Sequence, residues 1–406
     1  MADIKPFAAL IPKPDLADQI CELPYDVMSS DEAREMAKDK PLSFLHVSKP
    51  EIDLPPETDP YSDAVYAKGA ENLQKLIADG HLFRDQKPNF YFYRQIMGDH
   101  SQIGLVAAAS CEEYLSNTIR KHEFTRPQKE DDRVRHIESL NSQTGPVFLT
   151  YRASSVIDAI ASEVTSKEPV VDFTGEDGVR HTSWTVSDES TIATIADEFA
   201  QIPNLYIADG HHRSAAAGRV FQSRNGAGAT PGFLTVIFPD HQMKILAYNR
   251  AVKTLNGLSP SQLLDKIDLV ATLVASAEPV EPASKHEFGM YLAGQWYRLQ
   301  FREHLLQSDD PVEMLDVALL QNNVLSPLLG IDDPRTSPGI DFVGGIRGLG
   351  ELERLVNQGS HQVAFSMYAT SIDDLMSVAD ADKVMPPKST WFEPKLRDAM
   401  FSYMLD

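Results

Sequence analysis

The pattern of apolar and polar residues along the chain predicts short strands and helices that alternate. Apolar runs at 89–96 and 101–110 flank Gly98-Asp99-His100, a spacing typical of a β-hairpin. A second hairpin is predicted over 170–186, with Glu176-Asp177-Gly178 as its turn. Hairpins beside strand–helix units indicate a mixed α+β fold. Further strands are predicted at 145–151, 205–208, 233–238, 244–248, 288–292 and 296–301, and helices at 30–39, 61–79, 127–140, 153–166, 188–201, 260–266 and 312–320.

The length of 406 residues predicts two or three domains. We expect an N-terminal α/β region over 1–152 and a middle region over 153–256. A C-terminal α/β region is expected over 257–406. No internal repeat or low-complexity tract marks a linker between them.

Composition narrows the classes of function. Hydrophobic residues make up 42% of the chain, but no run approaches the roughly 20 apolar residues of a membrane span. The N-terminus lacks the pattern of a signal peptide, and two cysteines without pairing spacing are typical of the reducing cytoplasm. A net charge of −22 opposes binding to nucleic acid or anionic lipid. We therefore expect a cytoplasmic protein that binds neither; its oligomeric state is left open.

The segment Asp209-Gly-His-His-Arg213, called here the DGHHR turn, is the most informative motif. It joins the apolar run 205–208 to a helical run at 214–221, for which Ser214 is the expected N-cap. A helix N-terminus attracts phosphate, and Arg213 adds a planar donor pair. Asp209 can bind a metal or take a proton, and Gly210 permits close approach of a ligand. A structural corner is the alternative, but two adjacent histidines favour a functional site.

A second segment, His122-Glu123-Phe-Thr125, precedes the helix that Pro127 is expected to begin. On this helix Lys129, Asp132, Arg133 and His136 share one face, because they are spaced three and four residues apart. The pattern indicates a general base beside a phosphate clamp, with a solvated ion-paired face as an equal alternative. A zinc protease is excluded, since a second histidine of an HExxH motif is missing.

A third segment, Met385 to Lys395, contains three prolines that fix an exposed stretch. Lys388 with Ser389 or Thr390 is predicted to reach a phosphate or substrate, unless the segment is only a structural strap. It is not a P-loop, because no GxxxxGK[ST] precedes it. Gly344 to Gly350 likewise lacks the context of a dinucleotide fingerprint.

Taken together, these motifs resemble the family named domain of unknown function 1015. The resemblance covers almost the whole chain and includes PYDV, SFLHV, the KHExT…DR block, ADGHHR and the MPPKST…PK tail. The DGHHR turn also resembles the signature of free serine kinases in the ParB/sulfiredoxin-like superfamily. That resemblance implies a ParB/sulfiredoxin-like core with a phosphate site at a strand–helix turn.

By this resemblance the chain is expected to be a kinase-like phosphotransferase that uses ADP or ATP with Mg²⁺ and acts on free L-serine or a similar small hydroxyl compound. Its alternatives are a phosphoserine phosphatase and a non-enzymatic nucleotide-binding module. The donor, the direction and the acceptor are left open. The expected catalytic residues are Glu123 as general base, Asp209 as metal ligand, and His211. The expected substrate or phosphate ligands are His122, Thr125, Lys129, Arg133, Gly210, His212, Arg213, Lys388, Ser389 and Thr390.

Overall fold

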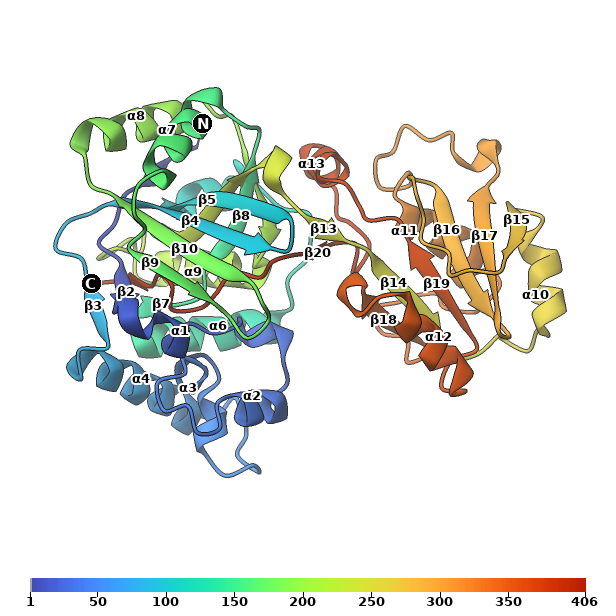
Figure 1. Ribbon diagram of the computed structural model, residues 1–406, viewed down its shortest axis with the longest axis horizontal. Helices are drawn as coiled ribbons and strands as arrows, with labels where there is room; N and C mark the ends of the chain where they lie inside the picture. Colours follow the sequence, from blue (N-terminus) through green and yellow to red (C-terminus); the bar gives the residue numbers. More distant parts are fainter. Residues whose placement is uncertain (1) are drawn as a thin grey trace. The chain divides into compact units, whose positions relative to one another are not determined.

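A computed structural model describes residues 2–406 and divides them into two compact units (Figure 1). Unit 1 contains the chain up to Met243 and also the C-terminal residues Pro394–Asp406. Unit 2 contains Lys244–Glu393. The expected boundary between residues 152 and 153 lies inside unit 1, and the one between residues 256 and 257 lies inside unit 2. Neither expected boundary therefore coincides with a boundary between the two units.

Unit 1 is built on a mixed sheet that has nine strands within residues 2–406. Two neighbouring pairs, β11 with β6 and β12 with β8, are parallel, and the other pairs are antiparallel. Along the sheet the order is β6 (Ile119–Arg120), β11 (Leu205–Asp209), β8 (Val147–Tyr151), β12 (Gly232–Pro239), β5 (His100–Ser110), β4 (Phe90–Met97), β10 (Arg180–Val186) and β9 (Val171–Thr174), with β1 (Ile4–Lys5) beside β5.

Both predicted hairpins are confirmed: β4 pairs with β5 and β9 with β10. Successive residues of a strand face opposite sides of the sheet, so each face of the sheet buries a different set of side chains. One face buries Phe92 and Leu149 against α7 (Ser155–Thr165) and α8 (Glu189–Phe199). On the opposite face Tyr91 and Tyr93 contact Phe401, at ring-centroid distances of 5.0 and 6.1 Å. The sheet is therefore covered on both faces, and one cover is the C-terminal segment.

The helices that position the site are α9 (His211–Ser223) and α6 (Pro127–Leu140), which contact each other, and α4 (Asp63–Ala78), which contacts α6. Helix α6 begins at Pro127 as predicted, since proline at the first helical position loses no hydrogen bond. The remaining elements of unit 1 are the helices α1 (Ala17–Ile20), α2 (Ser30–Met36), α3 (Leu45–Ser48) and α5 (Cys111–Leu115), the 3₁₀ helices η1 (Pro14–Leu16), η2 (Tyr25–Val27), η3 (Pro50–Asp53) and η4 (Asp240–Gln242), and the strands β2 (Leu10–Pro12), β3 (Leu82–Arg84), β7 (Ser142–Gln143) and β21 (Tyr403–Met404).

The start of α9 corrects the prediction of Ser214 as N-cap. The helix begins three residues earlier, at His211, and Gly210 is its N-cap with φ 98°. Ser214 is the fourth residue of the helix, and its hydroxyl donates back to the carbonyl oxygens of Gly210 and His211, at 3.3 and 3.0 Å. A glycine in the left-handed region turns the chain sharply, which places both histidines and Arg213 in the first helical turn.

Unit 2 contains a six-stranded antiparallel sheet within the described residues, in the order β15-β17-β16-β19-β14-β18. Leu352 of α12 packs on Tyr291 and Trp296 in its core. Its elements are β13 (Ile245–Leu246), β14 (Tyr248–Val252), α10 (Pro260–Ile267), β15 (Ala271–Ser276), β16 (Glu287–Leu292), β17 (Gln295–Phe301), the 3₁₀ helix η5 (Glu303–Leu305), α11 (Asp316–Leu320), the π-helix η6 (Gln321–Leu325), β18 (Ile340–Gly344), the 3₁₀ helix η7 (Gly345–Arg347), α12 (Leu349–Asn357), β19 (Val363–Met367), α13 (Ile372–Asp380) and β20 (Trp391–Phe392).

Two predicted elements of unit 2 differ from the structure. The helix expected at 312–320 begins only at Asp316, because Leu315 has extended dihedrals and Asp310 accepts from the Val312 N–H instead. The strand expected at 244–248 is divided into β13 and the start of β14. Helix α10 is confirmed, with Ser259 as N-cap in a capping box with Gln262. The mixed α+β class is confirmed.

No helix in residues 2–406 is long and apolar enough to cross a membrane.

We predict that Gly104→Ala destabilises unit 1. A Cβ at this strand position would lie 2.5 Å from Val236 Cγ1 and 2.8 Å from Phe238 Cζ, both fully buried on β12. Overpacking of this kind costs about 1–3 kcal/mol. Urea-dependent hydrogen exchange of peptides from β5 and β12 would measure the loss. The control is Gly350→Ala, whose Cβ meets no atom within 4 Å and which should leave exchange in β5 unchanged. Equal exchange in Gly104→Ala and the wild type would contradict the packing described here.

Candidate functional site

The DGHHR turn lies where β11 ends and α9 begins, as predicted. Asp209 is the last residue of the strand, and the N-cap of α9 is Gly210, which makes no side-chain capping hydrogen bond. The first N–H groups of a helix have no partner within the helix, and they lie at the positive end of its dipole. The thirteen-residue α9 therefore presents uncapped backbone donors directly after a carboxylate, which is the arrangement that binds phosphate and a phosphate-bound cation.

Asp209 is held by a lysine from the C-terminal segment. The Lys395 ammonium donates to Asp209 Oδ2 at 2.9 Å, and the two side chains are 15% and 31% exposed. Burial alone would raise the pKa of Asp209, but Lys395 and Arg213 together hold it well below its usual range. Asp209 is therefore an anion at neutral pH, able to bind a cation but poorly suited to accept a proton.

His211 is buried and neutral. The backbone N–H of His122 donates to His211 Nε2 at 3.5 Å, so that nitrogen is the acceptor and Nδ1 carries the hydrogen. The imidazole rings of His122 and His211 meet edge to face at 4.5 Å. Burial and then the neighbouring His122 hold the pKa of His211 well below its usual value, and burial lowers that of His122 to about 4. Both rings stay uncharged at neutral pH.

His212 anchors the same loop from the other end. The backbone N–H of Arg126 donates to His212 Nε2 at 3.0 Å. The loop at residues 122–126 is thus hydrogen-bonded to His211 at its start and to His212 at its end. Glu123 belongs to this loop, and its Oε2 lies 3.9 Å from His211 Nδ1. This distance is too long for a hydrogen bond, but the predicted base stands beside the DGHHR turn with its side chain 58% exposed. The sequence therefore located two segments that the fold brings together.

The Arg213 side chain is 10% exposed, and its guanidinium is hydrogen-bonded to two protein groups. Its Nη1 donates to the Pro146 carbonyl oxygen at 2.5 Å, and its Nη2 donates to Asp26 Oδ2 at 3.3 Å. Burial disfavours the guanidinium charge, but the Asp26 and Asp209 carboxylates raise the pKa of Arg213 overall. The positive charge is therefore fixed beside the first turn of α9, where it strengthens attraction of an anion.

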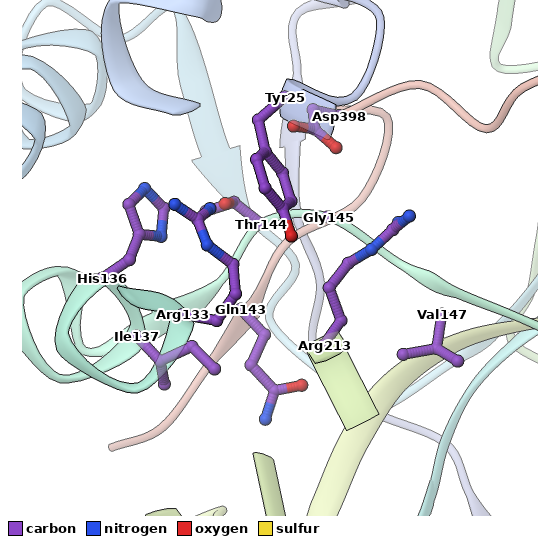
Figure 2. Close-up of a pocket in the computed structure, with 10 residues that line it drawn as sticks. All are labelled: Tyr25, Arg133, His136, Ile137, Gln143, Thr144, Gly145, Val147, Arg213 and Asp398. Atoms are coloured by element: carbon purple, nitrogen blue, oxygen red, sulfur yellow. The ribbon is translucent and has the colours of Figure 1, made fainter. Parts of the chain in front are cut away.

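A small cavity of about 30 Å³ lies beside Arg213 (Figure 2). Arg133 lines it with its guanidinium carbon 3.8 Å from the Tyr25 ring centroid, and Asp132 accepts two hydrogen bonds from Arg133. Asp398 also lines the cavity, and burial raises its pKa to about 7 although Arg213 opposes the shift. The cavity has room for about one or two water molecules and is lined by charges of both signs.

Two other predicted ligands, Lys129 and Thr125, have protein partners, and so does His136. Lys129 donates to the Tyr61 hydroxyl at 3.3 Å, and the Thr125 hydroxyl donates to Glu130 at the start of α6. His136, on the predicted face with Arg133, binds the Val47 carbonyl oxygen at 3.0 Å. Phosphate binding by Lys129 and Thr125 stays a prediction, whereas Arg133 shares a cavity with Arg213.

The predicted tail residues belong to unit 2. Ser389 is buried and donates to the Pro386 carbonyl oxygen at 2.6 Å, and the Ser389 carbonyl oxygen accepts from Thr370. The exposed Lys388 lies over the Tyr248 ring at 5.4 Å. The described contacts of this stretch are those of a structural strap. Substrate binding by Lys388, Ser389 and Thr390 stays a prediction.

A larger cleft of about 590 Å³ also lies in unit 1, lined by Arg397 but not by the DGHHR turn. Its two cations are already paired: Arg397 with Asp177 at 2.7 Å, and Lys40 with Glu176 at 2.7 Å. Three further carboxylates line it, those of Asp18, Glu22 and Asp39. The excess of negative charge disfavours a polyphosphate there.

A magnesium ion fits this site only together with a substrate. No group of three or more His, Cys, Asp or Glu side chains in residues 2–406 is placed to hold a metal ion. Mg²⁺ keeps several waters and is commonly bound by one or two carboxylates plus substrate phosphates. Asp209 can supply one such carboxylate, so the metal would arrive with the phosphate that it neutralises.

The family is shown by a sequence model described as protein of unknown function (DUF1015), which matches residues 4–318. The chain belongs to this family, so the resemblance inferred from its motifs is confirmed. No curated protein matches the chain.

Several solved structures are similar to the chain at low identity. A free serine kinase in complex with AMP is 14% identical, with a TM-score of 0.34 over 73% of this chain and 92% of that one. SbnI with a C-terminal truncation, from Staphylococcus aureus, is 11% identical, with a TM-score of 0.38 over 72% and 85%. A conserved hypothetical protein from Pyrococcus furiosus is 15% identical, with a TM-score of 0.34 over 73% and 93%.

Sequence reasoning missed Lys395 and Asp398 and gave little weight to Tyr25 and Asp26. The PYDV and PK motifs, which contain three of these residues, signalled that their segments matter, but no spacing rule relates residue 26 or 395 to residue 209. Asp398 had no local signal, because a lone carboxylate near the end of a chain is usually exposed.

We predict that Lys395→Met lowers the free energy of unfolding by about 1–3 kcal/mol at pH 7, since it leaves Asp209 without its ammonium partner. The folded pKa of Asp209 lies below the unfolded value of about 3.9. Its stabilisation is therefore present above that value and is lost as the pH falls further. Urea unfolding at several pH values should show the deficit at pH 7 and its decline below about pH 4.

Lys5→Met is the matched control, because Lys5 forms an exposed ion pair with Asp3 in the same unit. It should shift stability by less than about 0.5 kcal/mol. A deficit in Lys395→Met that is equally large at pH 3 and pH 7 would show that the ion pair is not its cause.

Proposed function

We propose that the chain is a nucleotide-dependent phosphotransferase acting on free L-serine, its phosphorylated form or a similar small hydroxyl metabolite. The observation that carries the proposal is the uncapped N-terminus of α9 between Asp209 and Arg213. The resemblance of the DGHHR turn to free serine kinases supports the same chemistry. A ParB/sulfiredoxin-like core, a link to serine metabolism and a cytoplasmic site of action belong to this proposal.

Phosphoryl transfer needs mainly positioning and charge neutralisation, and the described residues can supply both. The backbone N–H groups at the start of α9 and the fixed charge of Arg213 would bind the phosphoryl oxygens. Asp209 would hold Mg²⁺, which neutralises phosphate charge when bound. Lys395 keeps Asp209 anionic in the absence of the metal.

The two histidines and the loop at 122–126 have a positioning role in this proposal. Because the Nε2 atoms of His211 and His212 accept backbone hydrogen bonds, each ring keeps its Nδ1–H for a phosphate oxygen or for Glu123. The sequence indicates Glu123 as the base that accepts the hydroxyl proton, and its place beside His211 supports a role near the reacting groups.

A phosphoserine phosphatase is the second candidate, since the same phosphate site would serve if water replaced the nucleotide. Its specific support is the size of the cavity beside Arg213, which has room for water. A non-enzymatic nucleotide-binding module stays the third alternative. Binding of DNA by such a module is disfavoured by the net charge of −22.

Phosphorus NMR of the full chain with Mg²⁺ tests the proposal. One sample holds ATP or ADP with L-serine, a second holds phosphoserine with AMP or ADP, and a third holds phosphoserine alone. We expect nucleotide-dependent exchange of phosphate with serine in the first two. Inorganic phosphate from the third sample would instead support the phosphatase, and binding of nucleotide without turnover in any sample would support the module.

We predict that Asp209→Asn lowers the transfer rate about 10²–10³-fold, because the phosphate charge loses its metal-binding carboxylate. Asp172→Asn is the control: Asp172 lies on β9, the edge strand at the far end of the sheet from β6 and β11, and it pairs with Arg180 of β10. It should transfer phosphate like the wild type. Equal rates for Asp209→Asn and Asp172→Asn would remove the DGHHR turn from the reaction.

A further inference from the structure

Two buried polar atoms of residues that line the small cavity have no hydrogen-bond partner within residues 2–406: Oδ1 of Asp398 and Nε of Arg213. Asp398 is 1% exposed, and both residues line the same cavity (Figure 2). Leaving a buried polar group without a partner is destabilising, because the group has lost its hydrogen bonds to water. An acceptor and a donor left open in one small cavity indicate a place for a group that both donates and accepts, which is the property of a hydroxyl.

A glycine leaves the space for that group. A Cβ on Gly145 would lie 2.9 Å from Asp398 Oδ1 and 3.6 Å from Arg213 Cδ. The backbone of Gly145 is outside the left-handed region, so its conformation does not require glycine. Its missing side chain keeps the carboxyl group accessible from the cavity.

Arg213 connects this cavity with the phosphate-binding turn. A Cβ on Gly210, the N-cap of α9, would lie 3.3 Å from Arg213 Nε. The same Nε is the donor left open beside Asp398. A hydroxyl in the cavity would therefore lie close to a phosphoryl group bound at the start of α9.

The charges that face Asp398 come from several elements. Arg213 belongs to α9, Arg133 to α6, Asp26 to η2, and Arg397 is the preceding residue. Tyr25 of η2 and His136 of α6 also line the cavity, and burial lowers the pKa of His136 to about 4, so it is neutral. Burial raises the pKa of Asp398 to about 7, which is near the optimum for a group that takes up and releases a proton.

We propose that the cavity holds the acceptor hydroxyl and that Asp398, rather than Glu123, accepts its proton. This rests on the proposed phosphotransferase function. The hydroxyl oxygen forms a bond to the terminal phosphorus of the nucleotide while the bond from that phosphorus to the bridging oxygen breaks. The nucleotide leaves with that electron pair, and the hydroxyl proton moves to Asp398 Oδ1. Glu123 is 58% exposed and its Oε2 lies 3.9 Å from His211 Nδ1, so we assign it a positioning role.

The test compares Asp398→Asn with Glu123→Gln in the full chain, measuring the pH dependence of phosphoryl transfer by phosphorus NMR. We predict that Asp398→Asn lowers the rate at least about 10²-fold and abolishes the fall in rate on the acid side of about pH 7. Glu123→Gln should lose less than about tenfold and keep that acid limb, because a positioning residue does not carry the proton. The reverse pattern would assign the proton to Glu123 and overturn the proposal.

A second readout does not depend on turnover. In infrared difference spectra between pH 5 and pH 9, the wild type should show a protonated carboxyl band at pH 5 that Asp398→Asn lacks. A wild type that transfers no phosphate but shows this band would contradict the proposed function while leaving the titration of Asp398 established. A spectrum without the band would show Asp398 ionised throughout and would overturn the proposal itself.

Gly145→Ala provides a variant that keeps Asp398 and blocks the space beside it. We expect its rate to fall at least about tenfold with the acid limb of the pH profile retained, since the hydroxyl is displaced but the carboxyl group still titrates. An unchanged rate in folded Gly145→Ala would show that the acceptor does not enter the cavity.

Discussion

The buried guanidinium of Arg213 is the interaction on which the site depends. It joins the first turn of α9 to the Pro146 carbonyl oxygen before β8 and to Asp26 in the N-terminal segment. A buried cation is stable only when it is paired and hydrogen-bonded, so these segments must be in place for the charge to be tolerated. The same contacts hold the positive charge of Arg213 beside the N-terminus of α9, where it would attract a bound phosphate.

The C-terminal segment completes this arrangement from the far end of the sequence. After unit 2, the chain returns to unit 1 (Figure 1). There Lys395 binds Asp209 and Phe401 packs on Tyr91. Asp398 reaches the cavity beside Arg213 from the same stretch. Contacts between residues 186 positions apart must form before the site is complete, and such distant contacts are slow to form because of loop-closure entropy.

Sequence reasoning located those parts of the site whose conformation is determined by residues adjacent in the sequence. A proline at the first helical position marked the start of α6, and a glycine between a buried strand and a helical run marked the DGHHR turn. The start of α9 was misplaced because Ser214 has the side chain of an N-cap, whereas Gly210 has the backbone conformation for the turn. The choice of Lys395 as the partner of Asp209 depends on tertiary contacts, which the pattern of a single sequence does not contain.

The proposed function depends on phosphate binding at the N-terminus of α9. A crystal structure of the full chain with Mg²⁺ and a non-hydrolysable ATP analogue would test this directly. We predict terminal phosphate oxygens within hydrogen-bond distance of the backbone N–H groups of His211 and His212, with the metal on Asp209. A nucleotide whose phosphates lie in the acidic cleft lined by Arg397, with the DGHHR turn vacant, would contradict it.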